Sequence, residues 1–260
     1  MGQHALIVGA SSGIGAALAL ELALEGYDVG LIARRTDRLA EVAERVRARG
    51  GVAAYRAADV NDAAQLKAAI AALEEVLGPV EVIIANAGIG ENTDAANLDL
   101  AHVRRVLRTN LEGVVLAIGA VLPAMTQRGH GRIGAVTSIA GMRPIPMIAA
   151  YGASKAGASA FLEALRADLR GSGVTVTDLC PGYVKTDMLK PQESGAYPPL
   201  TMDAGDTARR MVRALLAGRD SLVFPWPLAW MSRFAALLPD ALIGPLLRRL
   251  APKPPPALPG

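Results

Sequence analysis

The chain has 260 residues, of which 52% are hydrophobic and 20% charged, with 27 basic and 24 acidic side chains. This composition predicts one folded domain with a sizeable core and excludes an intrinsically disordered chain. A net charge of +3 is too small to indicate a nucleic-acid partner. The single cysteine, Cys180, excludes an internal disulfide framework. Three scattered histidines have no metal-ligand spacing, so we expect no metal site.

The first residues and the hydropathy pattern bear on location. The N-terminus reads Met-Gly-Gln-His and enters an apolar run without a basic region, so we expect no signal peptide. No run of about 18 uncharged apolar residues predicts a membrane span. We therefore expect a cytoplasmic protein.

Short apolar runs alternate with Ala-rich segments of helical period. The predicted strands are residues 5–8, 28–32, 52–56, 80–85, 131–137, 174–179 and 221–224, and the predicted helices are residues 13–25, 36–49, 63–77, 100–128, 149–170 and 204–216. Strands that are apolar at consecutive positions are buried on both faces. Repeated strand–helix–strand units form right-handed crossovers. The sequence therefore predicts an α/β fold, a doubly wound parallel sheet with helices on both faces.

Glycines cluster directly after the first predicted strand, in the segment Gly9-Ala10-Ser11-Ser12-Gly13-Ile14-Gly15. Gly9 permits a tight turn, while Gly13 and Gly15 let a pyrophosphate and the sheet approach the backbone. The free N–H groups at the start of the following helix then face an anion. We predict a dinucleotide phosphate site here; the alternative is an ordinary strand-to-helix turn, which also favours glycine.

The end of the second predicted strand bears on the choice of nucleotide. A carboxylate there binds a free ribose 2′-hydroxyl, whereas an arginine binds a 2′-phosphate. The sequence reads Ala33-Arg34-Arg35, without an acid, and Arg38 follows. We expect Arg34 to contact the phosphate, with Arg35 or Arg38 adding to it; the alternative is that all three only solvate an exposed helix. We therefore favour NADP(H) as the cofactor, with NAD(H) as the second choice.

Further motifs follow in order along the chain. They are Asp59-Val60, Asn86-Ala87-Gly88, Asn110, Ser138, Tyr151-Gly152-Ala153-Ser154-Lys155, and Pro181-Gly182 followed by Val184 and Thr186. With the glycine loop, they resemble the short-chain dehydrogenase/reductase family over residues 3–224. The resemblance implies a Rossmann-type sheet of seven strands in the order 3-2-1-4-5-6-7. Val8 departs from the pattern, because the family often has threonine there.

The resemblance also implies roles for these motifs. Asp59 and Val60 would contact adenine, and residues 181–186 would enclose the nicotinamide. Lys155 would bind the nicotinamide ribose, and Asn110 would anchor a water that relays protons.

The physical argument for Tyr151 and Lys155 needs no family. One helical turn separates them, so both project from the same face of the predicted helix. A lysine ammonium beside the phenol, with an oxidised nicotinamide nearby, is expected to lower the tyrosine pKa from about 10. Tyr151 would then exchange a proton with an alcohol or carbonyl, while Ser138 donates to the same oxygen. Taken alone, each of these residues could serve only in packing, capping or solvation. Taken together, they predict a set of catalytic residues.

We therefore expect an oxidoreductase that transfers hydride reversibly between NADP(H) and a carbonyl/alcohol substrate. The alternative is a non-catalytic dinucleotide-binding sensor or scaffold. Segments after the fifth and sixth strands should line the substrate pocket, which we expect to be apolar. Its candidate residues are Met142, Arg143, Met147, Tyr183 and Met188. Arg143 either binds an anionic group of the substrate or is simply an exposed loop residue. We expect residues 190–200 to form a mobile lid. We expect Cys180 to be a core packing residue.

The C-terminal region differs from the rest of the chain. We divide the sequence into a catalytic dinucleotide-binding domain (1–224), an apolar helical extension (225–250) and a Pro-rich tail expected to be flexible (251–260). Residues 209–260 carry a net charge of +6. Two short helices broken at prolines fit residues 228–250. Three interpretations remain open for them: packing on the pocket, an interface in a homo-oligomer (dimer or tetramer), or peripheral membrane contact through 226–250.

Overall fold

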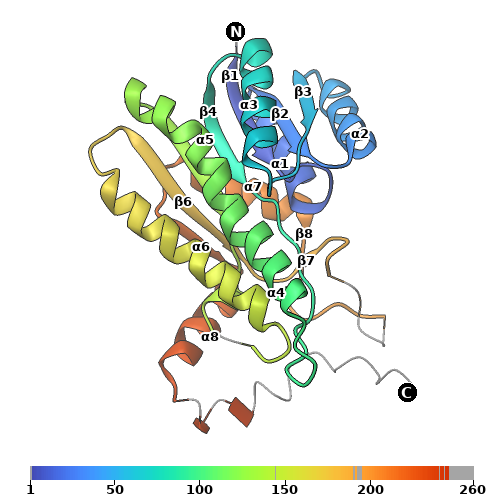
Figure 1. Cartoon of the computed structure of the whole chain (residues 1–260), viewed down its shortest axis with the longest axis vertical. Coiled ribbons are helices and arrows are strands. Elements are labelled where there is room, and N and C mark those ends of the chain that lie inside the picture. The colour runs from blue at the N-terminus through green and yellow to red at the C-terminus, as the bar shows by residue number, and fades with distance from the viewer. Residues whose placement is uncertain are drawn as a thin grey trace.

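A computed structural model of the chain describes residues 2–143, 145–189, 191, 195–239, 241–242 and 244–245. Its centre is a parallel sheet of seven strands (Figure 1). In chain order these are β1 (Gln3–Val8), β2 (Tyr27–Ala33), β3 (Ala53–Ala57), β4 (Val80–Ala85), β5 (Gly131–Val136), β6 (Val174–Pro181) and β9 (Ser221–Phe224). The strand order is β3-β2-β1-β4-β5-β6-β9, which confirms the predicted doubly wound topology, with β9 as the predicted seventh strand.

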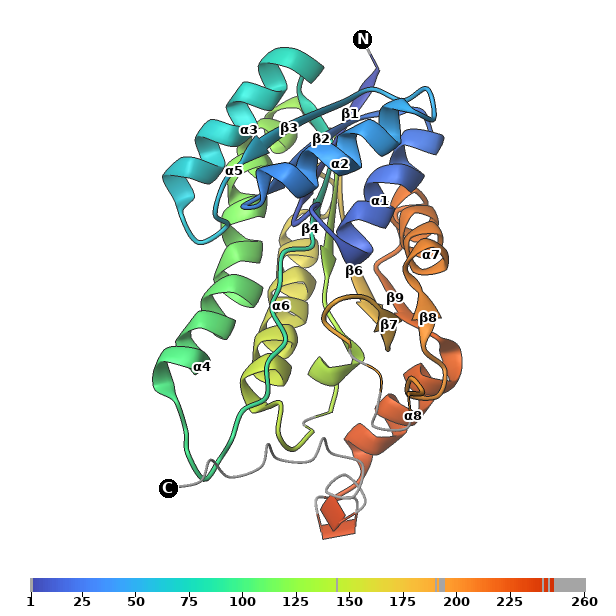
Figure 2. The ribbon, with the colours of Figure 1, turned by 90° about the vertical axis from the view of Figure 1, so that its right-hand side faces the viewer.

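Helices cover both faces of the sheet (Figure 2). One face is covered by α1 (Gly13–Leu24), α2 (Thr36–Arg47) and α7 (Ala204–Leu216). The other is covered by α3 (Ala63–Leu77), α5 (Gly113–Arg128) and α6 (Ala149–Asp168). The remaining helical segments are α4 (Leu100–Leu107), the π-helical turn η1 (Arg108–Glu112), the 3-10 turn η2 (Ile139–Gly141) and α8 (Trp226–Leu237).

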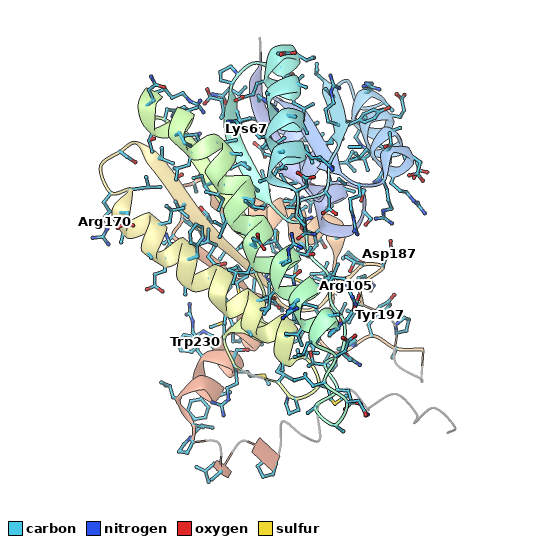
Figure 3. The ribbon with its side chains drawn as sticks, viewed as in Figure 1. Lys67, Arg105, Arg170, Asp187, Tyr197 and Trp230 are labelled. Carbon is cyan, nitrogen blue, oxygen red and sulfur yellow. The ribbon has the colours of Figure 1, made fainter. Side chains whose placement is uncertain are left out.

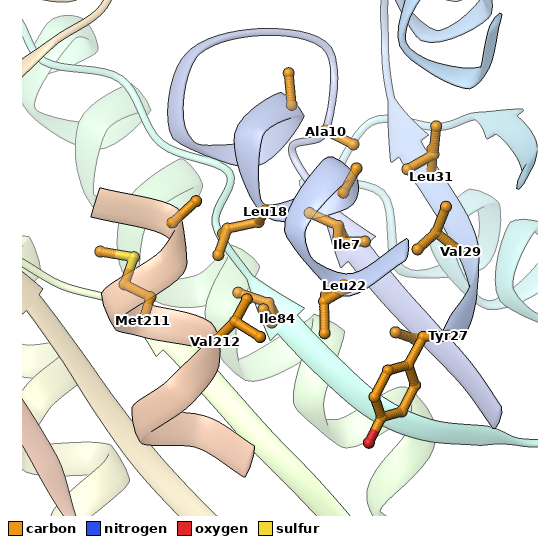
Figure 4. Packing of buried hydrophobic residues seen from close by; sticks show 14 of the residues in the cluster. Ile7, Ala10, Leu18, Leu22, Tyr27, Val29, Leu31, Ile84, Met211 and Val212 are labelled. Carbon is orange, nitrogen blue, oxygen red and sulfur yellow. The ribbon is translucent and has the colours of Figure 1, made fainter. Parts of the chain in front are cut away.

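The central strand shows why consecutive apolar residues predicted a doubly covered sheet. Ala5 and Ile7 point into one core cluster, where Ile7 packs near Leu18 and Leu22 of α1 (Figure 4). Leu6 and Val8 point into the other cluster, under α3 and α5. Because strand side chains alternate in direction, burial of both faces requires an apolar residue at every position.

The predicted helix over residues 100–128 is interrupted. It consists of α4, the π turn η1 and α5, because η1 inserts extra backbone between two α-helical parts. By length and composition, Leu100–Arg128 is apolar enough to cross a membrane, with a mean hydropathy of 1.4. Its α5 part contributes Val114, Ile118 and Val121 to the core over the sheet. This is the position of a core helix.

Turns at the amino edge of the sheet depend on glycine. Gly26, Gly50, Gly78 and Gly171 have positive φ angles between 81° and 87°, and a Cβ at any of them would meet nothing within 4 Å. They lie in the turns that lead into β2, β3, β4 and β6. Gly78 ends α3, whose N-terminus is capped by the Asp62 carboxylate.

The carboxyl edge of the sheet carries the longer connections. A small second sheet pairs β7 (Val184–Lys185) with β8 (Met202–Asp203), which the sequence analysis did not predict. Here α8 follows β9 and begins at Trp226, two residues before the predicted start. It ends at Leu237, ahead of Pro239. The second predicted helix extends beyond the described residues, and the tail 251–260 lies outside them.

Candidate active site

The glycine loop closes tightly on the loop after β4. A Cβ at Gly9, whose φ is 92°, would lie 2.5 Å from the backbone N of Ala87. A Cβ at Gly15 would lie 2.1 Å from the Gly9 carbonyl oxygen. Asn86 donates from Nδ2 to that same oxygen at 2.8 Å. Gly9 and Gly15 are therefore required by close packing, and Asn86 fixes the turn.

A cleft of about 440 Å³ opens at the carboxyl ends of β1, β2 and β4. It brings together thirteen of the predicted cofactor residues: Gly9, Ser11, Ser12, Gly13, Ile14, Arg34, Arg35, Asp59, Val60, Asn86, Ala87, Gly88 and Thr186. It also contains residues that the sequence analysis did not name as cofactor-binding, among them Asn61, Ile89, Thr109 and Asp187. This is the position at which doubly wound sheets bind dinucleotides, the point where the strand order reverses.

Arg35 reaches back over the glycine loop. Its Nη2 donates to Ser11 Oγ at 3.0 Å and to Ser12 Oγ at 2.9 Å. Arg34 also lines the cleft, whereas Arg38 is exposed and pairs with Glu41 at 3.3 Å. The guanidinium held at the loop is therefore that of Arg35, although the sequence favoured Arg34.

Thr186 approaches the phosphate loop from the opposite side. A Cβ at Gly13 would lie 3.0 Å from Thr186 Cγ2, so the segment after β6 folds across the start of α1. Val184 is buried and pairs with Met202 in the small sheet. Pro181 ends β6, and Gly182 donates its N–H to the Phe224 carbonyl at 2.7 Å. Pro181, Gly182 and Val184 are not part of the cleft wall.

Tyr151 and Lys155 lie on the first turns of α6, beside the Gly88 end of the cleft. Lys155 Nζ is 5.9 Å from the centroid of the Tyr151 ring and donates to the Val136 carbonyl at 2.7 Å. A Cβ at Gly88 would lie 3.5 Å from Lys155 Nζ. Ser138 is buried at the end of β5 and hydrogen-bonds to Tyr151. The predicted catalytic residues therefore converge at one end of the cleft.

The pKa of Tyr151 departs from the expectation. Burial raises it above 10.0, a hydrogen bond from Ser138 opposes the rise, and the charge of Lys155 is not among the causes. Burial also lowers the pKa of Lys155 to about 8. For the chain's own groups the pKa of Tyr151 is therefore raised by burial and not lowered by the lysine. The expected acidification beside an oxidised nicotinamide stays a prediction.

Asn110 is fully buried in the π turn η1. Its Oδ1 accepts from the Ile89 N–H at 2.8 Å, and its Nδ2 donates to the Ile89 carbonyl at 2.9 Å and to Ser154 Oγ at 3.1 Å. The side chain thus holds the loop after β4 against α6. π turns occur often at functional sites. This one places the Asn110 amide between the loop after β4 and α6.

Thr93 is a positioning residue that the sequence analysis missed. It is buried, and its Oγ1 accepts from the Ala150 N–H at 3.2 Å, within the first turn of α6. Its own N–H donates to the Met147 carbonyl at 2.6 Å. Met147 has a φ of 70°, a left-handed conformation that is uncommon outside glycine. Because these contacts join distant segments, no local signal could reveal them.

Met188 covers the approach to Tyr151. A Cβ at Gly90 would lie 2.8 Å from Met188 Sδ and 3.8 Å from Tyr151 Cε2. The thioether therefore lies in the space that Gly90 leaves beside the phenol ring. Met188 is itself 50% exposed, and Tyr183 is 40% exposed. Met142 follows η2 and is partly buried.

The remaining predictions concern Arg143, Cys180, the lid segment and metal binding. Arg143 is partly buried, not an exposed loop residue. Cys180 is buried, and burial raises its pKa to about 12, so the thiol is an inert core residue as expected. The predicted lid over residues 190–200 includes positions 190 and 192–194, which lie outside the described residues. No cluster of three or more potential metal ligands occurs within the part of the chain that the structure describes.

Comparison with known proteins agrees with the fold and the motif order. The chain belongs to the short-chain dehydrogenase family, whose model matches residues 3–196. An uncharacterized oxidoreductase of Myxococcus xanthus is 38% identical over 249 residues, which are 95% of this chain and 97% of the relative. A putative ketoacyl reductase of Streptomyces coelicolor is 38% identical over 188 residues, or 72% of each chain.

Solved structures show the same arrangement. Actinorhodin polyketide ketoreductase with NADPH is 31% identical and superposes with a TM-score of 0.76 over 85% of this chain and 94% of its own. Gluconate 5-dehydrogenase from Burkholderia cenocepacia, in complex with NADP and tartrate, is 26% identical with a TM-score of 0.78 over 88% of this chain and 95% of its own. The chain is thus an oxidoreductase of this family that acts on carbonyl or alcohol groups.

Proposed function

We propose that the protein is an NADP(H)-dependent oxidoreductase that reduces a small apolar ketone or oxidises the corresponding alcohol. The observation that carries the proposal is the convergence of Ser138, Tyr151 and Lys155 at one end of a dinucleotide-sized cleft. The relatives named as ketoacyl reductases support a carbonyl as the reacting group.

The preference for NADP(H) rests on Arg35. The cleft has a guanidinium between Ser11 and Ser12, and the end of β2 has no carboxylate. Two hydroxyls and a guanidinium match the acceptor oxygens of a 2′-phosphate, because charge-assisted hydrogen bonds to phosphate are strong. The neighbours solved with NADPH and NADP are consistent with this choice.

The residues fit a nicotinamide cofactor, since only glycine at positions 9 and 15 leaves room for the loop geometry described above. That cofactor would supply the hydride. The chain's own groups handle the proton: the raised pKa of Tyr151 keeps the phenol protonated at neutral pH, so it is ready to donate to a carbonyl oxygen. Ser138 donates to the same oxygen, which stabilises the charge that develops there.

Lys155 and Asn110 act around this proton donor. Lys155, anchored on Val136, places a cation close to the phenol ring and next to Gly88, where a nicotinamide ribose would lie. Asn110 uses its amide to fix Ile89 and Ser154. In our proposal Asn110 therefore orients the loop and α6, and any water would lie near the Ile89 carbonyl.

An apolar substrate side is supported by methionines near the proton donor. Met188 lies beside Tyr151, and Met142 and Met147 belong to the segment that precedes α6. Methionine side chains adapt to irregular apolar molecules. We therefore propose a ketone with a hydrophobic body.

The test is the Tyr151→Phe variant, assayed with a panel of ketones and NADPH. Turnover should fall by about 10²–10⁴-fold, the usual contribution of a general acid. NADPH affinity, measured by fluorescence, should stay within about threefold, because the hydroxyl does not line the nucleotide cleft. Turnover that equals that of the wild type would remove Tyr151 from this role. If neither protein turns over any ketone or alcohol while both bind NADPH, the chain is a dinucleotide-binding sensor.

A further inference from the structure

The outer surface of α8 is unusually apolar. Its exposed fractions are 73% for Trp226, 66% for Trp230, 64% for Phe234 and 82% for Leu237. At about 100° per residue, these four positions fall within an arc of about 80° on the helix. We call this surface the aromatic stripe; Figure 3 shows Trp230 on α8 at the lower end of the molecule.

The opposite side of α8 faces the protein and is built from smaller side chains. Ala229 is 5% exposed, and Leu228 packs where a Cβ of Gly182 would lie, 2.9 Å from its Cδ1. A helix on a soluble protein normally places its largest apolar side chains inward. Here α8 is reversed, so the aromatic stripe needs an apolar partner outside the domain.

Arg233 decides what kind of partner fits. It is exposed and falls about 20° outside the arc, next to Trp226 on the helix surface. Among the described residues it has no hydrogen-bond or ion-pair partner, but its charge acts on buried Cys180, whose pKa it lowers against the rise caused by burial. In a symmetric dimer through this stripe, two like-charged guanidinium groups would be buried close together, which is costly. At a lipid surface the same guanidinium extends to a phosphate while the aromatic rings enter the interface.

The charge of the chain agrees with a lipid surface. Residues 226–260 contain four basic side chains, Arg233, Arg248, Arg249 and Lys253, and one acidic side chain, Asp240. Tryptophan prefers the headgroup level of a bilayer, and basic residues are attracted to anionic lipids. We propose that the aromatic stripe of α8 binds the surface of an anionic phospholipid bilayer. This goes beyond the proposed reaction and does not depend on it.

The test uses a natural reporter. The chain has two tryptophans, Trp226 and Trp230, and both lie on the aromatic stripe. The full-length protein is titrated with vesicles of phosphatidylcholine containing about one third phosphatidylglycerol, and with phosphatidylcholine alone. We expect tryptophan emission to shift to shorter wavelength and to be quenched by brominated lipid, most strongly with the anionic vesicles.

Variants make the test specific while keeping both tryptophans. Phe234→Ser with Leu237→Ser should weaken binding more than tenfold, because two apolar side chains no longer enter the lipid. Arg233→Glu should weaken binding to anionic vesicles about tenfold and change binding to neutral vesicles little. The matched control is Leu24→Ser with Val76→Ser, which removes two exposed apolar side chains from α1 and α3. This control should bind like the wild type.

Three results would overturn the proposal. One is the absence of any emission shift with either vesicle. Another is equal affinity of the wild type, the Phe234/Leu237 variant and the control. The third comes from sedimentation velocity without lipid: a dimer that the Phe234/Leu237 substitutions dissociate would show that a second copy covers the stripe.

Discussion

Lys155 donates from Nζ to the carbonyl oxygen of Val136 at 2.7 Å, so the ammonium is tied to the end of β5 while its stem runs beside Tyr151. The anchor explains how a cation persists in a buried position. The carbonyl dipole replaces part of the hydration that the ammonium loses on burial. The hydration that is not replaced lowers the pKa of Lys155 to about 8.

The buried ammonium gives stability a defined pH dependence. The pKa of Lys155 is 10.5 in the unfolded chain and about 8 in the folded one, a difference worth about 3 kcal/mol. Below about pH 8 the folded state bears this cost in full. As pH rises toward 10.5 the folded state loses its proton first, so the free energy of unfolding increases.

The measurement compares wild type with Lys155→Met by denaturant unfolding from pH 7 to 9.5. The free energy of unfolding of the wild type should rise by about 2 kcal/mol relative to the variant over this range. The upper limit stays below the raised pKa of Tyr151, whose ionisation would act in the opposite direction. A difference that is flat with pH would mean that Lys155 is well solvated.

Arg35 should control nucleotide preference. Arg35→Gln removes the guanidinium at Ser11 and Ser12, and we expect the Kd for NADPH to rise about 10–100-fold, while that for NADH changes little. Arg38→Gln is the matched control, since Arg38 pairs with exposed Glu41 outside the cleft. Arg34→Gln shows how much the second arginine adds. Equal loss of both nucleotides in Arg35→Gln would contradict a role at the 2′-phosphate.

Thr93 should act on turnover through α6. Thr93→Val keeps the shape but removes the acceptor for the Ala150 N–H, which begins the helix that carries Tyr151. We expect a loss of about 1 kcal/mol in stability and a several-fold lower kcat. NADPH affinity should stay unchanged, because Thr93 does not line the cleft. Thr93→Ser restores the acceptor and should restore kcat; failure of this rescue would count against positioning.

Gly90 should control the fit of the substrate. In Gly90→Ala the new Cβ would stand 2.8 Å from Met188 Sδ, so the thioether must move from its place beside residue 90. We expect KM for an apolar ketone to rise several-fold with a smaller change in kcat. Met188→Ala in the same chain should abolish the effect of Gly90→Ala, since the clash is gone. Additive effects of the two substitutions would show that they act separately.

Much of the fold could be predicted from local sequence. β1, with Leu6 and Ile7 buried on opposite faces, showed its double burial directly in its composition. The break at η1 could not be predicted, because the residues around Asn110 have an ordinary helical pattern and the extra backbone is stabilised by contacts to Ile89 and Ser154. The β7–β8 pair was missed for a similar reason: each strand has two residues, too few to show a period.

The site was predictable where chemistry depends on residue type at a fixed spacing. The glycine loop and the Tyr151–Lys155 pair belong to this class. Which of Arg34 and Arg35 reaches the glycine loop was not predictable, because it depends on the path of the chain between β2 and α2. The rise in the pKa of Tyr151 that burial causes in the chain alone was not predicted, since the sequence shows the neighbouring lysine but not how deeply the phenol is buried.

The glycine turns at the amino edge of the sheet have a practical consequence. At Gly26, Gly50, Gly78 and Gly171 an added Cβ would meet no atom within 4 Å, and each turn enters a strand at the end remote from the cleft. Peptide tags or fluorescent domains spliced into these four positions should leave catalysis untouched. The same edge would suit immobilisation on a solid support, with the reactive end turned toward the bulk liquid.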